Sequence, residues 1–464
     1  MNVLLLSTYE LGRQPFGLAS PAAWLRREGA RVTCLDLSRQ RLAEEAVRSA
    51  DLIAFYVPMH TATRLAARAS ETVRRLNPNA HLCFYGLYAP VNESYLRGLG
   101  ADTILGGEFE QGLVDLLRRL RKGGRAASGN GQSRRERGQP EPLISLARQN
   151  FLVPDRSDLP PLARYAQLHL GNGRQRTVGY VEASRGCKHL CRHCPIVPVY
   201  EGKFRIVQRA VVLEDIRRQV AAGAEHITFG DPDFFNGVGH AVALVRALHD
   251  EHPALTYDVT IKIEHLLKHA EHLQTLRETG CLFVTSAVES VDDGVLARLD
   301  KGHTRSDFIE VVRRFREVGL TLSPTFVAFT PWTTLPGYLE LLRVLAKLEL
   351  VENVAPIQLA IRLLIPAGSK LLELSEMQEM VGEFDPAALS YHWQHRDPRV
   401  DRLRWDVQEA VKAGEAQGQS RGEIFGRIWA LAHEAAGEHA EEIPGCKGAL
   451  PRAAVPYLNE PWYC

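Results

Sequence analysis

The chain has 464 residues, which corresponds to about three domains of about 150 residues each. Its 56 Lys and Arg residues nearly balance its 55 Asp and Glu residues, so the formal net charge is +1. A hydrophobic fraction of 45% and a charged fraction of 24% are typical of a folded globular protein. These values argue against a disordered chain and against a broadly basic surface that binds nucleic acid.

Neither a membrane span nor a secretory signal is expected from the sequence. No apolar run approaches the ~20 residues that a membrane helix needs. The first residues, MNVLLLSTYE, carry no basic segment and lead directly into a strand-like pattern. We therefore expect a cytoplasmic protein in a reducing compartment, where closely spaced cysteines indicate metal or redox chemistry instead of crosslinking.

Residues 1–120 alternate short apolar runs with segments of helical periodicity. This alternation predicts a parallel sheet covered on both faces, and five strands favour a flavodoxin-like, doubly wound domain. Ligands of such sheets bind beyond the carboxyl ends of the strands. The predicted strands are Val3–Leu6, Val32–Leu35, Leu52–Tyr56, His81–Phe84 and Thr103–Leu105.

Residues 121–142 read as a flexible linker, because Gly, Ser, Pro and charged residues dominate and no apolar period survives. The segment is basic, but no aromatic residues lie between the basic ones. We therefore favour a tether over a nucleic-acid contact.

Residues 143–366 contain six successive strand and helix patterns, which predict an α/β partial barrel of the (β/α)6 type. In such barrels the chemistry gathers at the carboxyl ends of the strands. Residues 367–464 are predicted to form a small, mostly helical C-terminal region with a cysteine-containing tail. The predicted barrel strands are Thr177–Ala183, His226–Phe229, Tyr257–Ile263, Leu282–Val288, Leu322–Phe329 and Ile357–Leu364.

Three cysteines follow the first predicted barrel strand with the spacing C-x3-C-x2-C. They are Cys187, Cys191 and Cys194. Thiolates are soft donors, so this group selects zinc or an iron–sulfur cluster. A structural zinc site would take His189 or His193 as its fourth ligand, but short zinc loops usually come as two paired halves and no second C-x2-C occurs.

This motif, on the loop after the first strand of a six-unit barrel, resembles the radical S-adenosylmethionine (SAM) superfamily. The resemblance implies a [4Fe–4S] cluster held by Cys187, Cys191 and Cys194, with one iron open to SAM. His193 stands where much of the superfamily has an aromatic residue, and a basic side chain there is a variation seen in cobalamin-type relatives.

The same resemblance assigns SAM contacts to the ends of the later barrel strands. The turn after strand two would receive the SAM ammonium, which needs carboxylate or carbonyl acceptors. Strand four would supply the ribose and carboxylate contacts, while weaker assignments follow strands three and six. The residues are Gly230, Asp231, Pro232 and Asp233 in the turn, Ser286 and Glu289 on strand four, and Lys262, Glu264 and Arg362.

A doubly wound domain before such a barrel resembles the cobalamin-binding group of the superfamily. Many of those domains carry a D-x-H-x-x-G motif, which is absent here. The only histidines of residues 1–120 are His60 and His81, and His60, at a strand end, is the one candidate cobalt ligand. Cobalamin binding therefore stays open at this stage.

The last residues, VPYLNEPWYC, prompt a narrower resemblance to the CUAEP/CCAEP-tail radical SAM proteins. Their tails continue into cysteine or selenocysteine followed by Ala-Glu-Pro, so we expect a selenocysteine codon or a truncation after Cys464. A terminal thiol or selenol is a strong nucleophile and a soft ligand. Cys464, with Cys446 as a second thiol, is predicted to present a soft substrate at the barrel mouth.

The resemblance implies an enzyme that cleaves SAM reductively and modifies a small molecule, with a flavodoxin- or ferredoxin-type electron donor. Alternatives are transfer of a 3-amino-3-carboxypropyl group to a soft element such as trivalent arsenic, and cobalamin-dependent radical methyl transfer. A methylthiotransferase would need a second cysteine triad, and Cys34 and Cys83 supply only two thiols near the N-terminus. A non-catalytic zinc- or thiol-binding protein is the alternative from another class.

Overall fold

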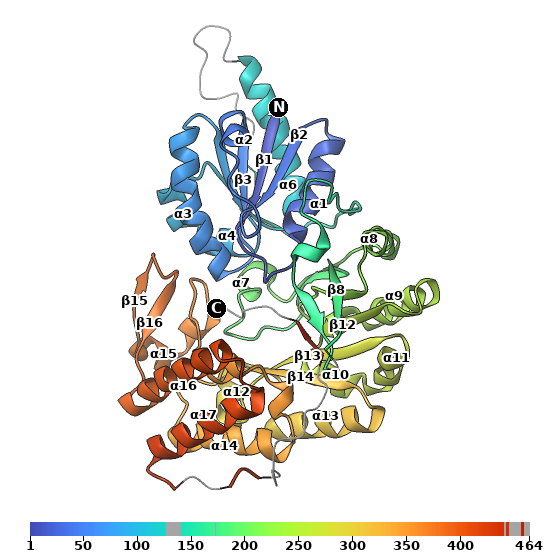
Figure 1. Ribbon diagram of the computed structural model, residues 1–464. Helices are drawn as coiled ribbons and strands as arrows, with labels where there is room; N and C mark the ends of the chain where they lie inside the picture. Colours follow the sequence, from blue (N-terminus) through green and yellow to red (C-terminus); the bar gives the residue numbers. More distant parts are fainter. Residues whose placement is uncertain (127–140, 172, 440–441, 445–455, 459–464) are drawn as a thin grey trace.

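The computed structural model describes residues 1–126, 141–171, 173–439, 442–444 and 456–458. They form two large sheets rich in parallel strands, one in each half of the molecule, with helices packed around both (Figure 1), and two small two-stranded sheets. Cys446, Trp462 and Cys464 lie outside the described residues. Among the described residues, no helix combines the length and the apolar character that crossing a membrane requires.

The N-terminal sheet has the strand order β2-β1-β3-β4-β5-β6, and all its pairs are parallel. Side chains of β1 alternate between two core clusters: Val3 and Leu5 lie in one, Leu4 and Leu6 in the other. Both faces of the sheet are therefore buried, as the doubly wound, flavodoxin-like prediction requires. The strands are β1 (Asn2–Ser7), β2 (Arg31–Asp36), β3 (Leu52–Tyr56), β4 (His81–Tyr85), β5 (Thr103–Gly107) and β6 (Ile144–Ser145).

Helices cover both faces of this sheet (Figure 1). They are α1 (Phe16–Arg27), α2 (Glu44–Arg48), α3 (His60–Leu76), α4 (Tyr88–Val91), α5 (Glu93–Gly98) and α6 (Phe109–Ala126). The last helix continues past residue 121, where the linker was predicted to begin, and Arg121 donates a 2.8 Å hydrogen bond to the carbonyl of Glu28. Residues 127–140 of the predicted linker lie outside the described residues. The predicted domain boundaries stay predictions.

The second sheet curls into a partial barrel with the order β14-β13-β12-β11-β8-β7-β17. Five of its strands are mutually parallel, and β7 and β17 join one edge in antiparallel pairs. The strands are β7 (Gln167–His169), β8 (Gln175–Val181), β11 (His226–Phe229), β12 (Thr256–Thr260), β13 (Cys281–Glu289), β14 (Thr321–Phe326) and β17 (Tyr457–Leu458).

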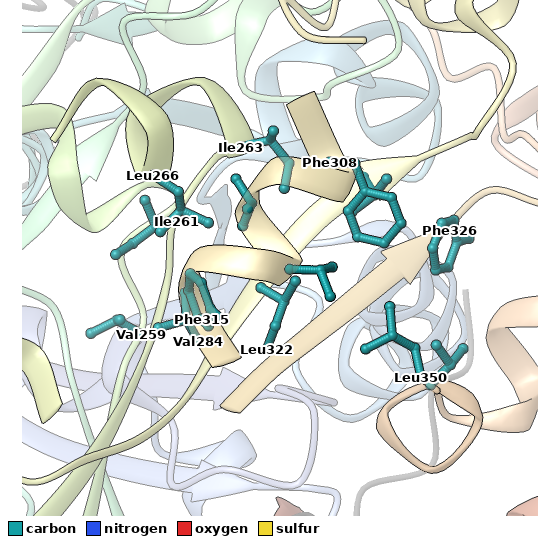
Figure 2. Packing of buried hydrophobic residues seen from close by; sticks show 14 of the residues in the cluster. Val259, Ile261, Ile263, Leu266, Val284, Phe308, Phe315, Leu322, Phe326 and Leu350 are labelled. Carbon is teal, nitrogen blue, oxygen red and sulfur yellow. The ribbon is translucent and has the colours of Figure 1, made fainter. Parts of the chain in front are cut away.

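The outer face of this sheet packs against a layer of helices. Figure 2 shows part of this core, in which Val284 and Leu322 of neighbouring strands meet Phe308 and Phe315 of α13. All four side chains are almost fully buried. The helices are α8 (Arg209–Ala221), α9 (Val238–Glu251), α10 (Ile263–Lys268), α11 (Leu273–Glu278), α12 (Asp293–Leu299), α13 (Arg305–Val318) and α14 (Leu335–Lys347).

The sixth predicted barrel strand, Ile357–Leu364, was wrong. A 3-10 helix, η5 (Pro356–Leu359), begins this segment, and only an isolated bridge between Phe329 and Arg362 remains of the expected pairing. The side-chain oxygen of Gln358 accepts a 3.1 Å hydrogen bond from the backbone N–H of Phe326. The Gln358 side chain therefore pairs with a backbone N–H at the edge of β14, where we predicted pairing with a sixth strand.

The C-terminal region is mostly helical, as predicted, and adds a hairpin that was not predicted. Its elements are α15 (Ser375–Met380), β15 (Val381–Asp385), β16 (Ser390–Trp393), α16 (Pro398–Ala416) and α17 (Arg421–Ala436). Val407 of α16 and Trp429 of α17 belong to the same core cluster as the barrel. Trp405 is 55% exposed, in contrast to the buried Trp393 and Trp429.

Candidate functional site

The cysteine loop leaves the barrel through a short antiparallel ribbon. The strand β9 (Ser184–Gly186) pairs with β10 (Phe204–Ile206), so both ends of the intervening segment, which contains α7 (Val197–Tyr200), are held together. Gly186, directly before Cys187, has a φ of +73°, and a Cβ there would lie 2.3 Å from a ring carbon of Tyr200. Only glycine meets both conditions without strain.

The middle of the loop is fixed to two other parts of the chain. The backbone N–H of Arg192 donates to the carbonyl of Leu299 over 2.9 Å, and the Ser369 hydroxyl donates to the Arg192 carbonyl over 3.1 Å. The loop is thus held against the end of α12 and the segment that follows the barrel. These two contacts fix the backbone in the middle of the loop.

The three thiols lie near one another on this loop. Burial raises the pKa of Cys187, and burial together with the neighbouring Cys191 and Cys187 thiols raises the pKa of Cys194 to about 12. Three thiolates in such a place need positive charge close by, which a metal centre supplies. This donor set fits an iron–sulfur cluster.

A single zinc ion fits the geometry less well. Among the described residues, the group with ligand atoms within 4.8 Å of one another is Cys187, His189 and Asp233, which includes only one of the three cysteines. A tetrahedral Cys3His site would bring all three sulfurs to one ion at about 2.3 Å. A cluster places each thiolate on a different iron and accepts wider spacing.

The turn after β11 lies beside this loop, and its two carboxylates are already engaged. Asp231 accepts hydrogen bonds from the N–H of Ala183 (2.9 Å) and from the Ser184 hydroxyl (2.5 Å), and burial raises its pKa to about 7. A Cβ on Gly230 would lie 1.8 Å from the Tyr180 hydroxyl oxygen. The acceptors that the turn leaves free for a ligand are therefore backbone carbonyls.

Asp233 belongs to a buried network of histidines that reaches the cysteine loop. One of its carboxylate oxygens lies 2.6 Å from Nδ1 of His265 and 3.4 Å from Nε2 of His189. Burial acts to raise the pKa of Asp233, but the hydrogen bonds from these histidines hold it below its usual value. Lys262 extends the network, with its Nζ 3.2 Å from Nδ1 of His189 and 3.3 Å from Glu264. Lys262 and Glu264 therefore support the loop from the start of α10.

A second buried network supports the other end of the loop. Glu289 accepts a 3.1 Å hydrogen bond from Nε2 of His193 and lies 3.4 Å from Nζ of Lys301. Burial acts to raise the pKa of Glu289, but the charge of Lys301 and the His193 hydrogen bond hold it at about 2. Lys301 was not among the predicted site residues, because α12 separates it in sequence from the end of β13.

Ser286 and Arg362, both predicted to contact SAM, have surroundings that differ from the predicted ones. Ser286 points to the face of β13 opposite Thr285 and Ala287, which line the barrel cavity, and its hydroxyl has no hydrogen-bond partner among the described residues. Arg362 lines the cavity, but its guanidinium stacks on the Trp393 ring at 3.6 Å and pairs with Asp401 at 2.9 Å. The structure thus brings Arg362 to the cavity and does not bring Ser286 there.

The barrel encloses a cavity of about 1590 Å³. Its lining includes strand residues, side chains of α16 and the turn Gly230–Pro232. Loops of the N-terminal half reach it through Leu11 and Arg13. This volume exceeds the roughly 300–1,000 Å³ of a usual small-molecule pocket.

The carboxyl ends of the N-terminal strands are packed against the barrel. Arg185, two residues before Cys187, is buried and lies 2.7 Å from Glu110, 3.4 Å from Glu108 and 2.6 Å from Glu182. Burial raises the pKa of Glu108 to about 7. This cluster joins the loop after β5 to the start of the cysteine loop.

Both histidines of residues 1–120 have a hydrogen-bond partner at Nε2. Nε2 of His60 is paired with the carbonyl of Ala388 on the β15–β16 hairpin. His81 lies at the opposite end of the sheet, 2.8 Å from the Thr103 hydroxyl. A histidine can ligate a metal through one ring nitrogen while the other is hydrogen-bonded, so these contacts do not exclude cobalamin.

Residues 181–334 match the family model of the radical SAM superfamily. The matched segment contains all three cysteines, the turn after β11, and Glu289, while the N-terminal sheet and the C-terminal region lie outside it. This part of the chain is a radical SAM domain, and the match indicates an enzyme. A radical SAM domain implies a [4Fe–4S] cluster and SAM. The match does not reach the C-terminal residues on which the CUAEP/CCAEP resemblance depends, so that resemblance is not shown.

Curated relatives match with low identity. The tRNA-2-methylthio-N(6)-dimethylallyladenosine synthase of Chlorobium luteolum is 27% identical over 33% of this chain and 36% of its own length. The hopanoid C-3 methylase of Methylococcus capsulatus is 23% identical over 71% of this chain and 64% of its own length. The chain spans little more than a third of the first of these relatives.

Two solved structures share the fold over most of the chain. The cobalamin-dependent SAM radical enzyme OxsB, with aqua-cobalamin and SAM bound, has a TM-score of 0.69 at 15% identity and covers 89% of this chain and 67% of that one. The radical SAM methyltransferase TsrM from Kitasatospora setae, with tryptophan and a SAM analogue bound, has a TM-score of 0.63 at 16% identity over 93% and 89%. The predicted fold class, a doubly wound domain before a partial radical SAM barrel, is confirmed.

Proposed function

We propose that this protein cleaves SAM reductively at the mouth of the partial barrel and modifies a small molecule in the adjacent cavity. The observation that carries the proposal is the cysteine loop, which holds three thiols next to the turn that lines a cavity large enough for SAM and a substrate. When bound, a [4Fe–4S] cluster would supply one electron to the sulfonium of SAM.

The side chains of the chain would bind and orient the cofactors. Cys187, Cys191 and Cys194 would hold the cluster, and the backbone carbonyls of Gly230–Pro232 would accept the SAM ammonium, because Asp231 and Asp233 are engaged within the protein. The cavity wall would exclude water from the reacting atoms.

We propose two positioning roles for the buried networks. The His193–Glu289–Lys301 network would fix the loop between Cys191 and Cys194 and place a positive charge beside it, where an anionic group of SAM would be stabilised. The network of His189, His265 and Asp233 would fix the loop on its other side. Both act through residues adjacent to the cysteines.

Cobalamin-dependent radical methyl transfer is the second candidate. It is favoured by the hopanoid C-3 methylase, which matches over 71% of this chain, more than the tRNA-2-methylthio-N(6)-dimethylallyladenosine synthase described above. His60, the first residue of α3, is the candidate cobalt ligand, and its Nε2 pairs with the carbonyl of Ala388. Cobalamin that co-purifies with the protein, and S-adenosylhomocysteine among the products, would favour this candidate.

The proposal also includes a role for two C-terminal thiols and an electron-donor protein. The thiols of Cys446 and Cys464 would present a soft substrate, with 3-amino-3-carboxypropyl transfer to trivalent arsenic as one outcome. Both cysteines lie outside the described residues. A flavodoxin- or ferredoxin-type protein would supply the electron.

Anaerobic reconstitution with iron and sulfide, followed by SAM and dithionite, tests the proposal. Mass analysis of the SAM fragments reports which bond breaks: 5′-deoxyadenosine marks one cleavage and methylthioadenosine the other. We expect one of these products in wild-type protein and neither in Cys191→Ala. If SAM stays intact in the iron-loaded protein, the proposed function is wrong.

A further inference from the structure

The face of α16 that lines the barrel cavity carries two basic and two acidic side chains, and Arg362 adds a further positive charge beside it. Residues on one side of a helix recur every three or four positions, and this pattern places one row of side chains toward the barrel. The cavity-lining residues of α16 are Pro398, Asp401, Arg404, Trp405, Gln408, Lys412 and Glu415.

Two guanidinium groups share a single carboxylate on this wall. One oxygen of Asp401 accepts from Arg362 (2.9 Å) and the other from the backbone N–H of His395 (3.0 Å), so Asp401 is already satisfied. Nε of Arg404 is buried and has no hydrogen-bond partner among the described residues. Burial and the positive charge of Arg362 lower the pKa of Arg404.

A flat apolar surface lies beside this unpaired donor. The guanidinium of Arg404 stands 4.5 Å from the centroid of the Trp405 ring, and Trp405 is 55% exposed although it lines the cavity. A large aromatic side chain that stays exposed next to a cationic group is typical of a ligand-binding surface. Gln408, one turn further along α16, also has a buried side-chain oxygen with no partner among the described residues.

We propose that Arg404 recognises an oxyanion of the substrate, a carboxylate or a phosphate, whose flat apolar body lies on Trp405, and that the nearby positive charge of Arg362 attracts the same oxyanion. The proposal rests on the proposed function in that it takes this cavity as the substrate site. The cavity of about 1590 Å³ leaves room for such a molecule beside SAM. Guanidinium groups bind both oxyanions through paired N–H donors.

Binding of three fluorinated probes to the reconstituted holoenzyme tests this inference. The probes are 4-fluorophenylacetate, 4-fluorophenyl phosphate and the neutral 4-fluorophenylacetamide, and fluorine NMR relaxation reports their dissociation constants. We expect at least one anion to bind about tenfold more tightly than the amide, because a guanidinium binds a charged oxyanion more strongly than a neutral amide. The anion that binds more tightly then shows whether the site prefers a carboxylate or a phosphate.

Matched variants localise the effect. Arg404→Gln should remove the preference for the anion, while Arg402→Gln should keep it, because the Arg402 side chain is 84% exposed and lies outside the cavity lining. Trp405→Leu should weaken all three probes by a similar factor. Equal melting temperatures of the variants exclude unfolding as the cause.

Three outcomes would overturn the inference: equal binding of anions and amide, an anion preference that survives Arg404→Gln, or no detectable binding of any probe up to 10 mM, roughly the weakest binding expected for fragments of this size. These measurements require no SAM cleavage. Failure of the proposed function would be seen as intact SAM in the cleavage assay, so the two failures are distinguishable.

Discussion

Nζ of Lys301 lies 3.4 Å from Oε1 of Glu289, and both residues are buried beside the cysteine loop. The two charges stabilise each other where water is scarce, and His193 completes the network from within the loop. An ion pair of this kind costs free energy to bury, but removal of one partner costs more because the other charge is left without compensation.

We therefore expect Lys301→Met to lower the free energy of unfolding by about 3–5 kcal/mol. Urea unfolding of the anaerobic protein measures this change. Lys347→Met, at an exposed position of α14, serves as the matched control and should change little. The double variant Lys301→Met/Glu289→Gln should recover part of the loss, and a strictly additive loss would contradict the ion pair.

Arg185 should hold the two sheets together through its buried acidic partners. Arg185→Met leaves Glu108, Glu110 and Glu182 without their cation, so we expect a loss of several kcal/mol in the free energy of unfolding. Limited proteolysis and urea unfolding both report this change. The exposed Arg217, which pairs with Glu214 and Glu251, provides a control through Arg217→Met. Similar losses in the free energy of unfolding of the two variants would contradict the larger contribution expected from the buried Arg185 cluster.

We expect the raised pKa of Glu108 to make the free energy of unfolding depend on pH. Burial raises its pKa from 4.5 to about 7. The folded state therefore holds its proton more tightly than the unfolded state, and the stability that is present below pH ~4.5 is lost as the pH rises through about 7. The full effect is roughly 3 kcal/mol at 1.36 kcal/mol per pKa unit.

The comparison of wild type with Glu108→Gln isolates this contribution. The difference in the free energy of unfolding between pH 5 and pH 8 should be smaller in the variant, because glutamine does not titrate. A variant with the same pH dependence as wild type would refute the assignment.

Gly186 should be needed for assembly of the cluster although it has no side chain. Gly186→Ala places a Cβ 2.3 Å from Tyr200 and 2.5 Å from the Lys203 carbonyl oxygen, so the start of the cysteine loop must shift. We expect iron content after reconstitution to fall severalfold with all three cysteines present. Gly29→Ala is a matched control, because Gly29 has a φ of +74° but no atom within 4 Å of the added Cβ. Full iron content in Gly186→Ala would contradict this role.

The sequence allowed the cysteine loop and the turn after β11 to be predicted, because parallel strands bring their carboxyl ends to one side of a sheet. The face of β13 was not predictable in the same way. One residue of shift decides between Ser286 and Thr285, and the alternation of β13 is interrupted near Ala287 in its pairing with β14.

Contacts made by tertiary packing could not be predicted either. Lys301 and Glu289 are separated by a helix, and Arg404 reaches the cavity only because α16 packs beside the barrel. Ile357–Leu364 has the apolar pattern of a strand, but Pro356 begins a helical turn and Gln358 bonds the edge of β14. Local pattern determines the type of a segment less strongly than the partner it meets.

Iron content and SAM cleavage in the three cysteine variants test the central claim most directly. We expect wild type and the control Cys34→Ala, in the N-terminal sheet, to bind about four iron atoms per chain and to cleave SAM with dithionite. Cys187→Ala, Cys191→Ala and Cys194→Ala should each lose the visible iron–sulfur absorbance and the cleavage. Retention of both properties in these variants, or one zinc and no iron in the wild-type protein, would contradict the account.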